Sequence, residues 1–246
     1  MKYAVCVKQV PDVNAPWGSG RMVMNAYDAS AMEAALTLVE AAGTGSIEVI
    51  TVGPASASET IRKALAMGAQ SATHLVVPED AALDAMAFAK ILASHLTDAD
   101  HDVILCGKQS QDMDAGLTGP MLATLVGIPY VSNAVGLSQE GAELVVLRQA
   151  DGGQEQIGIT PRCLVTCSND MNDPRIPSIK GIMTAKRIQI ETVAVDVEAV
   201  VGPTKTQLHS IDPLPDPEPG VQFDGEIEEV VPALYTALRD EARVLA

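Results

Sequence analysis

A three-layer α/β fold, built on a mainly parallel and doubly wound sheet, is predicted by two features of the sequence. Up to about residue 127, short apolar segments alternate with segments whose apolar residues repeat at helical spacing. After Pro129 the predicted strands follow one another through tight turns without helices, which indicates an antiparallel addition. We expect an α/β domain over residues 1–200. A Pro-rich arm and a last helix should occupy residues 201–246.

Four strand-and-helix units account for the first half of the chain. Strands are expected over residues 3–10, 47–52, 74–77 and 102–106, where Val, Ile, Leu and Cys dominate. Asp28 should cap the first helix, which ends at the turn near Gly43. Ser56 to Glu59 has capping-box spacing for the second helix, which should stop at Gly68. A third helix is expected over 81–96 and a fourth, with Thr118 as its cap, over the residues up to 126.

The second half is predicted to add strands over 130–137, 143–148 and 154–159, with the hairpin turn at Asp151-Gly152-Gly153. The apolar segment 162–167 should return to the parallel sheet. Residues 188–200 look extended. An apolar helical stripe runs from residue 227 to Leu245, and because Pro232 interrupts it, the regular helix should begin near Val231.

Composition excludes several classes of protein. The chain has 246 residues, 47% of them hydrophobic and 20% charged, which fits a folded globular domain. A net charge of −16 argues against binding to nucleic acid or to anionic membranes. No apolar segment approaches the ~20 residues that cross a bilayer. The first strand begins at Tyr3, which leaves no room for a targeting segment, so we expect a cytoplasmic protein without membrane insertion.

Catalytic and metal-binding patterns are missing from the sequence. The four Cys residues lack zinc-site spacing, and the four His residues are scattered, so neither a metal site nor a catalytic triad is expected. Neither G-x-G-x-x-G, a Walker A motif nor a nucleophile elbow occurs. The cysteines are interpreted as reduced, small hydrophobic residues. We expect a binding role without catalytic residues.

The loop from Gly107 to Thr118 is the strongest candidate for a ligand site. It follows a predicted buried strand and leads into a helix, an arrangement that places ligands at the carboxyl end of a parallel sheet. Gly107 permits a close approach of the backbone to a ligand, and N–H groups at a helix start attract anions. The alternative is an ordinary surface loop between a strand and a helix.

The segment from Ser168 to Lys186 combines turn residues with apolar ones. Ile176, Ile179, Ile182 and Met183 lie between Pro and Gly residues. So much apolar surface in one loop either folds back on the core or docks on a partner, and the residue types leave both open.

Several ordered stretches together resemble the β subunit of electron-transfer flavoproteins. They cover nearly the whole chain, and their order is more specific than any single one: Val5–Asp12 (VCVKQVPD), Met24–Asp28 (MNAYD), Glu59–Ala69 (ETIRKALAMGA), Leu105–Gln109 (LCGKQ), Asp151–Gly153 (DGG), Asn172–Arg175 (NDPR) and Ser178–Met183 (SIKGIM). The resemblance implies a Rossmann-like fold of the adenine-nucleotide-binding kind. It also implies an obligate heterodimer with an α subunit, which holds most of the shared FAD.

The resemblance further implies that this chain binds one structural AMP. The matching positions are Cys6, Asn25, Ala26, Tyr27, Asp28, Val52, Gly107, Lys108, Gln109, Ser110, Gln111, Asp112, Met113, Asp114, Ala115, Gly116, Leu117 and Thr118. Because carboxylates repel phosphate, Asp112 and Asp114 should face ribose, adenine or solvent, which leaves Lys108 and the loop N–H groups for the phosphate. Electron-bifurcating relatives hold a second FAD in place of AMP, and that alternative stays open.

Residues 169–187 match the family's recognition loop, which docks on acyl-CoA dehydrogenases. Ile179 occupies the anchor position, with Ile182 and Met183 beside it. The resemblance implies an electron carrier that passes electrons from such a flavoenzyme toward a quinone oxidoreductase, and a C-terminal arm that contacts the α subunit. Two rival interpretations are a nucleotide-dependent ligase on a similar sheet and a solitary nucleotide-binding regulator.

Overall fold

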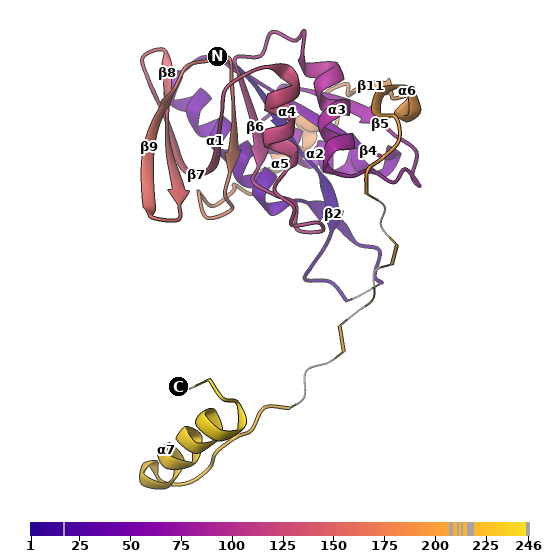
Figure 1. The fold of residues 1–246 in the computed structure, drawn as a ribbon. Coiled ribbons are helices and arrows are strands. Elements are labelled where there is room, and N and C mark those ends of the chain that lie inside the picture. Colours follow the sequence, from indigo (N-terminus) through magenta and orange to yellow (C-terminus); the bar gives the residue numbers. More distant parts are fainter. Residues whose placement is uncertain (17, 207–208, 211, 213, 216–218, 245–246) are drawn as a thin grey trace. The chain divides into compact units, whose positions relative to one another are not determined.

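The computed structural model describes the chain except for residues 17, 207–208, 211, 213, 216–218 and 245–246 (Figure 1). The chain forms two compact units, Met1–His209 and Ser210–Ala246, and each is described by itself.

One nine-stranded sheet organises the first unit. The first seven strands in its spatial order are mutually parallel, and each of the last two pairs antiparallel with the strand before it. The antiparallel addition predicted after Pro129 is confirmed, although its first strand, Tyr130–Glu140, also pairs in parallel with Cys163–Cys167. In that order the strands are β11 (Glu191–Ala194), β5 (Ser71–Val76), β4 (Ser46–Gly53), β1 (Lys2–Cys6), β6 (Val103–Gly107), β10 (Cys163–Cys167), β7 (Tyr130–Glu140), β8 (Glu143–Ala150) and β9 (Gly153–Ile159).

The order of the strands creates a switch point between β1 and β6. From β1 the chain passes to β4 and β5 on one side, and it then crosses back to place β6 on the other side of β1. Connections leave these two neighbouring strands in opposite directions, so a crevice opens at their carboxyl ends. Open α/β sheets bind ligands at this place.

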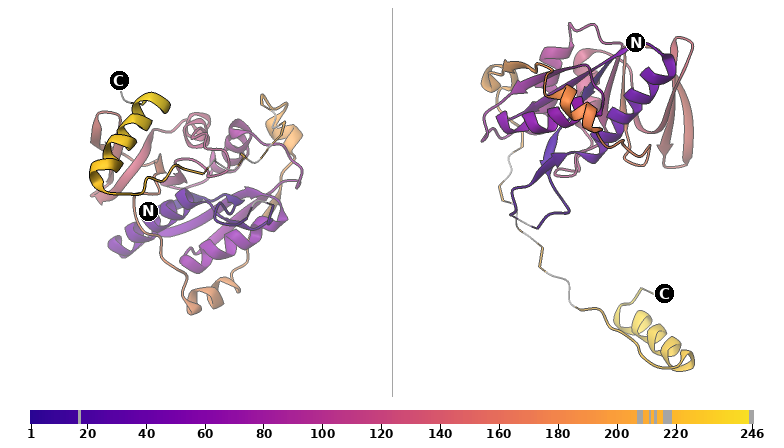
Figure 2. Two further views of the ribbon diagram at one scale, coloured as in Figure 1. Left: turned by 90° about the horizontal axis from the view of Figure 1, so that it is seen from below. Right: turned by 180° about the vertical axis from the view of Figure 1, so that it is seen from behind.

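Two hydrophobic cores lie on opposite faces of the sheet. Helices α1 (Ala26–Ala42) and α2 (Ser58–Met67) contribute to one core, and α3 (Ala85–Leu96) and α4 (Thr118–Val126) to the other. Figure 1 shows α3 and α4 in front of the sheet, and the view from behind in Figure 2 brings the indigo α1 forward. The three-layer prediction is therefore confirmed.

The first predicted strand is wrong in its length. The sheet strand ends at Cys6, and Gln9–Pro11 forms β2, which pairs with β3 (Met22–Met24) in a separate antiparallel sheet. The break follows from the partners of the backbone: Val7 N–H donates to Ile50 O of β4, whereas Lys8 O accepts from Asn25 N–H. The chain leaves the parallel sheet between these two residues.

Three predicted helix caps are also wrong. Helix α1 begins at Ala26, so Asp28 lies within its first turn. Helix α2 follows a 3₁₀ turn over Ala55–Ala57 and has no side-chain cap, and α4 has Leu117, not Thr118, at its cap position. Helix α3 begins at Ala85, later than the predicted residue 81, and the carboxylate of Asp84 caps it by accepting a hydrogen bond from Ala87 N–H at 2.8 Å. Tertiary partners explain the start of α1: Asp28 accepts hydrogen bonds from Lys8 N–H, just after β1, and from Gly107 N–H of β6, and does not cap its own helix.

The segment after β10 contains more structure than expected. Helix α5 (Ile179–Ala185) lies within the predicted recognition loop, and residues 188–200 divide into β11 and the short helix α6 (Val197–Val201). The hairpin predicted at Asp151-Gly152 is confirmed, because it joins β8 to β9.

The second unit consists mainly of α7 (Ile227–Thr236), followed by a π-helical turn over Ala237–Glu241. The prediction that the helix begins near Val231 is wrong, since Pro232 lies inside the helix. None of the α7 residues is buried. Leu245, the last residue of the predicted stripe, lies outside the described residues.

Candidate functional site

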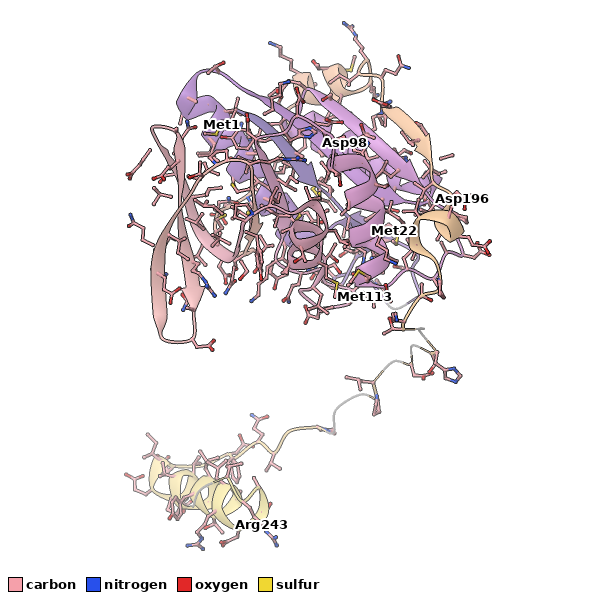
Figure 3. All side chains as sticks on the ribbon, turned by 45° about the horizontal axis from the view of Figure 1, so that its top comes forward. Met1, Met22, Asp98, Met113, Asp196 and Arg243 are labelled. Carbon is pink, nitrogen blue, oxygen red and sulfur yellow. The ribbon has the colours of Figure 1, made fainter. Side chains whose placement is uncertain are left out.

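A pocket opens at the switch point, at the carboxyl ends of β1, β4 and β6. It encloses about 780 Å³ of empty space, part of which is open solvent. In Figure 3 Met113, which lines this pocket, lies on the side of the domain opposite Met1 and Asp98. The wall is largely apolar on the α3 side, where Leu83, Phe88 and Leu92 line it.

Asp28 connects the carboxyl ends of β1 and β6, the two strands of the switch point, by hydrogen bonds. Its side chain is buried, and its carboxylate accepts hydrogen bonds from Lys8 N–H at 2.8 Å and from Gly107 N–H at 2.9 Å. Burial raises the pKa of this carboxyl to about 7, although the two N–H donors act in the opposite direction. Asp28 thus holds the carboxyl ends of β1 and β6 at a fixed separation.

Gly107 makes close contact with the first turn of α1. A Cβ atom at this position would collide with Asp28 Oδ1 and lie 2.6 Å from Tyr27 Cβ and 2.9 Å from Asp28 N. The missing side chain therefore makes room for the first turn of α1, a role that local sequence does not reveal. Gly107 also lines the pocket, and its close approach to a ligand stays a prediction.

Side-chain amides fasten the loop to the start of α1. Asn25 Nδ2 donates to Gln109 O at 2.8 Å, and Asn25 Oδ1 accepts from Gln111 N–H at 3.2 Å. In return Gln111 Oε1 accepts from Ala26 N–H at 3.2 Å, which satisfies one donor of the helix start. These reciprocal hydrogen bonds tie the loop to the start of α1.

Lys8 is a pocket residue that the sequence interpretation missed. Its Nζ lies 2.7 Å from Asp112 Oδ2 and 5.1 Å from the centroid of the Phe88 ring. It also donates to Ser110 Oγ at 3.2 Å. The available signal was its place at the carboxyl end of the first strand. Because Lys8 neutralises Asp112, that carboxylate does not confront the pocket as a free negative charge.

The turn into α4 offers unpaired donors to the pocket. Within the described residues, none of the backbone N–H groups of residues 115–119 donates a hydrogen bond. Ala115, Gly116, Leu117 and Thr118 also line the pocket. Gly119 packs against β10, because a Cβ there would lie within 3.6 Å of Leu164 Cδ2 and closer still to Thr166. Consecutive N–H groups at a helix start form a site for an anion.

The structure brings most of the predicted site residues to this pocket. Those that line it are Cys6, Asn25, Asp28, Val52, Gly107, Lys108, Gln109, Ser110, Met113, Ala115, Gly116, Leu117 and Thr118. Ala26, Tyr27, Gln111, Asp112 and Asp114 do not line it and instead support the loop; Asp114, for example, accepts from Gln109 Nε2. Lining residues that the sequence interpretation missed are Val7, Lys8, Ile50, Leu83, Ala85, Phe88, Leu92 and Cys106.

A second candidate site is the segment 169–187, whose backbone is anchored while its apolar side chains face outward. Arg175 donates to Glu33 and Glu40 of α1, with Nη2 2.9 Å from Glu33 Oε1 and 3.0 Å from Glu40 Oε2. Ile179 is 83% exposed, and Ile182 and Met183 are 44% and 51% exposed. Folding back on the core, one of the two alternatives for these three side chains, therefore does not occur.

Close packing holds α5 in place. Arg62 donates to Ala185 O and Ile188 O, and Ser178 Oγ caps the helix by accepting from Gly181 N–H at 3.0 Å. Gly181 approaches α2 so closely that a Cβ there would collide with Ala66 O. The helix presents its exposed side chains on a fixed support.

Neither a membrane-spanning helix nor a metal centre emerges from the described part of the chain. No helix there has the length and apolarity needed to cross a bilayer. No group of three or more His, Cys, Asp or Glu side chains there is placed to hold a metal ion.

Comparison with known proteins places the chain in a family. Residues 19–198 match the electron transfer flavoprotein domain. The electron transfer flavoprotein subunit beta of Bradyrhizobium diazoefficiens is 36% identical over 100% of both chains, and that of Bacillus subtilis is 32% identical over 99% of this chain and 94% of its own. Subunit CarD of the caffeyl-CoA reductase-Etf complex of Acetobacterium woodii is 35% identical over 75% of both chains. The chain belongs to the family of electron transfer flavoprotein β subunits.

Proposed function

We propose that the chain is the β subunit of a heterodimeric electron-transfer flavoprotein and binds AMP at the switch-point pocket. In this proposal segment 169–187 docks on acyl-CoA dehydrogenase-type flavoenzymes. The FAD shared with the α subunit takes up electrons there and delivers them toward a quinone oxidoreductase. The chain itself makes and breaks no covalent bonds; it binds, positions and docks.

The unpaired N–H groups of residues 115–119, beside an apolar wall, carry the nucleotide part of the proposal. They suit a phosphate group, because a helix start supplies donors and a favourable dipole to an anion. Leu83, Phe88 and Leu92 suit the flat apolar faces of a base. The pocket therefore offers one polar end and one apolar side, as a mononucleotide requires.

Exposed apolar side chains on α7 support the proposal of an α-subunit partner. Ile227 and Val231 are 75% and 57% exposed, and Leu234 and Tyr235 are 42% and 53% exposed, so within the described residues of the second unit α7 buries no apolar face. Such exposed apolar surface on a helix marks an interaction site. We assign the arm and helix of residues 201–246 to contact with the α subunit.

The nucleotide is identified by releasing it from the purified αβ complex. Acid precipitation followed by chromatography should yield one AMP and one FAD per complex. Two FAD and no AMP would replace this proposal by its alternative, a bifurcating subunit that holds a second FAD. The opening of the pocket to solvent favours retaining that alternative, since the rest of a larger dinucleotide could extend outward.

The docking part is tested by substituting the proposed anchor. Ile179→Ala should slow reduction of the shared FAD by an acyl-CoA dehydrogenase, because a buried Ile contributes about 1.5–3 kcal/mol to an apolar contact. The FAD absorption spectrum should not change. Leu125→Ala is the matched control, since Leu125 is also exposed, at 44%, but lies on α4. Equal reduction rates for the two variants would exclude the anchor role.

A further inference from the structure

Two cysteines face each other at the floor of the pocket, and the nucleotide-binding proposal does not use their chemistry. Cys6 ends β1, Cys106 lies in β6, and the two are direct partners in the parallel register. Both belong to the core on the α3 and α4 side, so their side chains point to the same face of the sheet. Both also line the pocket, with 8% and 6% of their surfaces exposed.

From this placement we infer that Cys6 and Cys106 form an oxidisable dithiol, which hydrogen peroxide converts to a disulfide when the nucleotide site is empty. The inference rests on the proposed function in one respect only, that a nucleotide normally covers the pocket floor. It adds a covalent modification to a site whose proposed role is binding alone.

The spacing of the strands permits the bond. Neighbouring strands lie about 4.7–4.9 Å apart, and disulfides join Cα atoms about 4.4–6.8 Å apart. Cysteines at partner positions with side chains on one face therefore already lie at a Cα separation that a disulfide can span. The other two cysteines have no such arrangement, because Cys163 and Cys167 are fully buried in the opposite core.

The neighbouring Cys6 thiol and burial together raise the pKa of Cys106 well above its usual value. A thiolate is the form of cysteine that attacks peroxide, so the reaction begins when one thiol of the pair loses its proton.

Hydrogen peroxide then oxidises the two thiols in two steps. One thiol loses its proton, and its thiolate attacks one oxygen of hydrogen peroxide, which gives a sulfenic acid and hydroxide. The released proton converts that hydroxide to water. The second sulfur then attacks the sulfenic sulfur, the S–O bond breaks as the S–S bond forms, and the proton of the second thiol leaves with the displaced hydroxide as the second water. Two thiols and one peroxide thus give one disulfide and two waters. Hydrogen peroxide is little larger than water, and the pocket that both cysteines line is open to solvent.

The test uses the αβ complex, refolded with FAD in the presence or absence of AMP, and treated with hydrogen peroxide. Peptide mapping after alkylation should find a Cys6–Cys106 linked peptide without AMP, and at least a tenfold smaller fraction with AMP. Cys163 and Cys167 should stay alkylatable in both samples. Should refolding without AMP fail, native complex incubated with 5′-nucleotidase, which destroys released AMP, provides the empty site.

Single variants test the role of each thiol. Cys106→Ser and Cys6→Ser should each abolish the linked peptide, and without its partner the remaining cysteine should persist as a sulfenic acid that dimedone traps. Absence of the linked peptide from the AMP-free complex would overturn the inference, as would equal amounts with and without AMP. Acid release of nucleotide from the same samples separates these outcomes from failure of the proposed function, which would appear as a complex that never contains AMP.

Discussion

Gly107→Ala tests the close contact between the end of β6 and the first turn of α1. The new methyl group would collide with Asp28 Oδ1 and lie 2.6 Å from Tyr27 Cβ. Since the backbone of Gly107 does not adopt a left-handed conformation, the effect is steric and not conformational. The start of α1 must move away, and the 2.9 Å hydrogen bond from Gly107 N–H to Asp28 is lost.

The expected loss of stability is about 3 kcal/mol. Overpacking costs about 1–3 kcal/mol, and a buried donor left without its acceptor costs about 1–3 kcal/mol more. Restriction of the unfolded chain by Ala offsets about 0.4–1 kcal/mol. For a chain of this size the melting temperature should fall by roughly 6–12 °C.

Thermal denaturation of the αβ complex measures this effect, with Gly152→Ala as the matched control. Gly152 has no neighbour within 4 Å of an added Cβ, so that variant should melt at or slightly above the wild-type temperature. Adding Asp28→Ala to Gly107→Ala should not restore stability, because the contacts with Tyr27 Cβ and Asp28 N remain and Lys8 N–H also loses its acceptor. A melting temperature for Gly107→Ala equal to that of Gly152→Ala would refute the steric argument.

Two further predictions concern Asp28 and the anchored segment. Burial raises the pKa of Asp28 to about 7, above its unfolded value of 3.8, so this group lowers stability as the pH rises from about 4 to about 7. Relative to wild type, Asp28→Asn should therefore become progressively more stable over that window in urea titrations at each pH, and a constant difference would contradict the assignment. Arg175→Met should increase hydrogen exchange across residues 174–186, because the contacts to Glu33 and Glu40 are lost. Arg148→Met, which removes only a longer 3.6 Å pair with Glu155, should not change exchange in that segment.

The order of strands and helices could be predicted because it depends on periodicity within short stretches. The alternation up to residue 127 and the hairpin at Asp151-Gly152 carry their signals locally. The helix caps could not be predicted in the same way. Asp28 is a good cap by residue type, yet its carboxylate binds Lys8 and Gly107, which are 20 and 79 residues away in the sequence.

The residues of the pocket likewise differ in how far the sequence predicts them. The loop from Gly107 to Thr118 was identifiable because it follows a strand in a parallel sheet and matches a family motif. The α3 wall was not, since Leu83 and Phe88 come to the pocket only through the packing of that helix on the sheet. Lys8 was identifiable in principle from its place after β1, but its partner Asp112 is 104 residues away.

If segment 169–187 docks as proposed, its anchored backbone bears on how long the partner stays bound. Because Arg175 and Arg62 already hold the backbone, such docking would require little free energy for ordering the loop. The lifetime of the proposed complex would then depend mainly on one side chain, whose burial changes a dissociation rate by about 10- to 150-fold. A carrier that, as proposed, leaves one flavoenzyme before it binds the next would benefit from so small a contact.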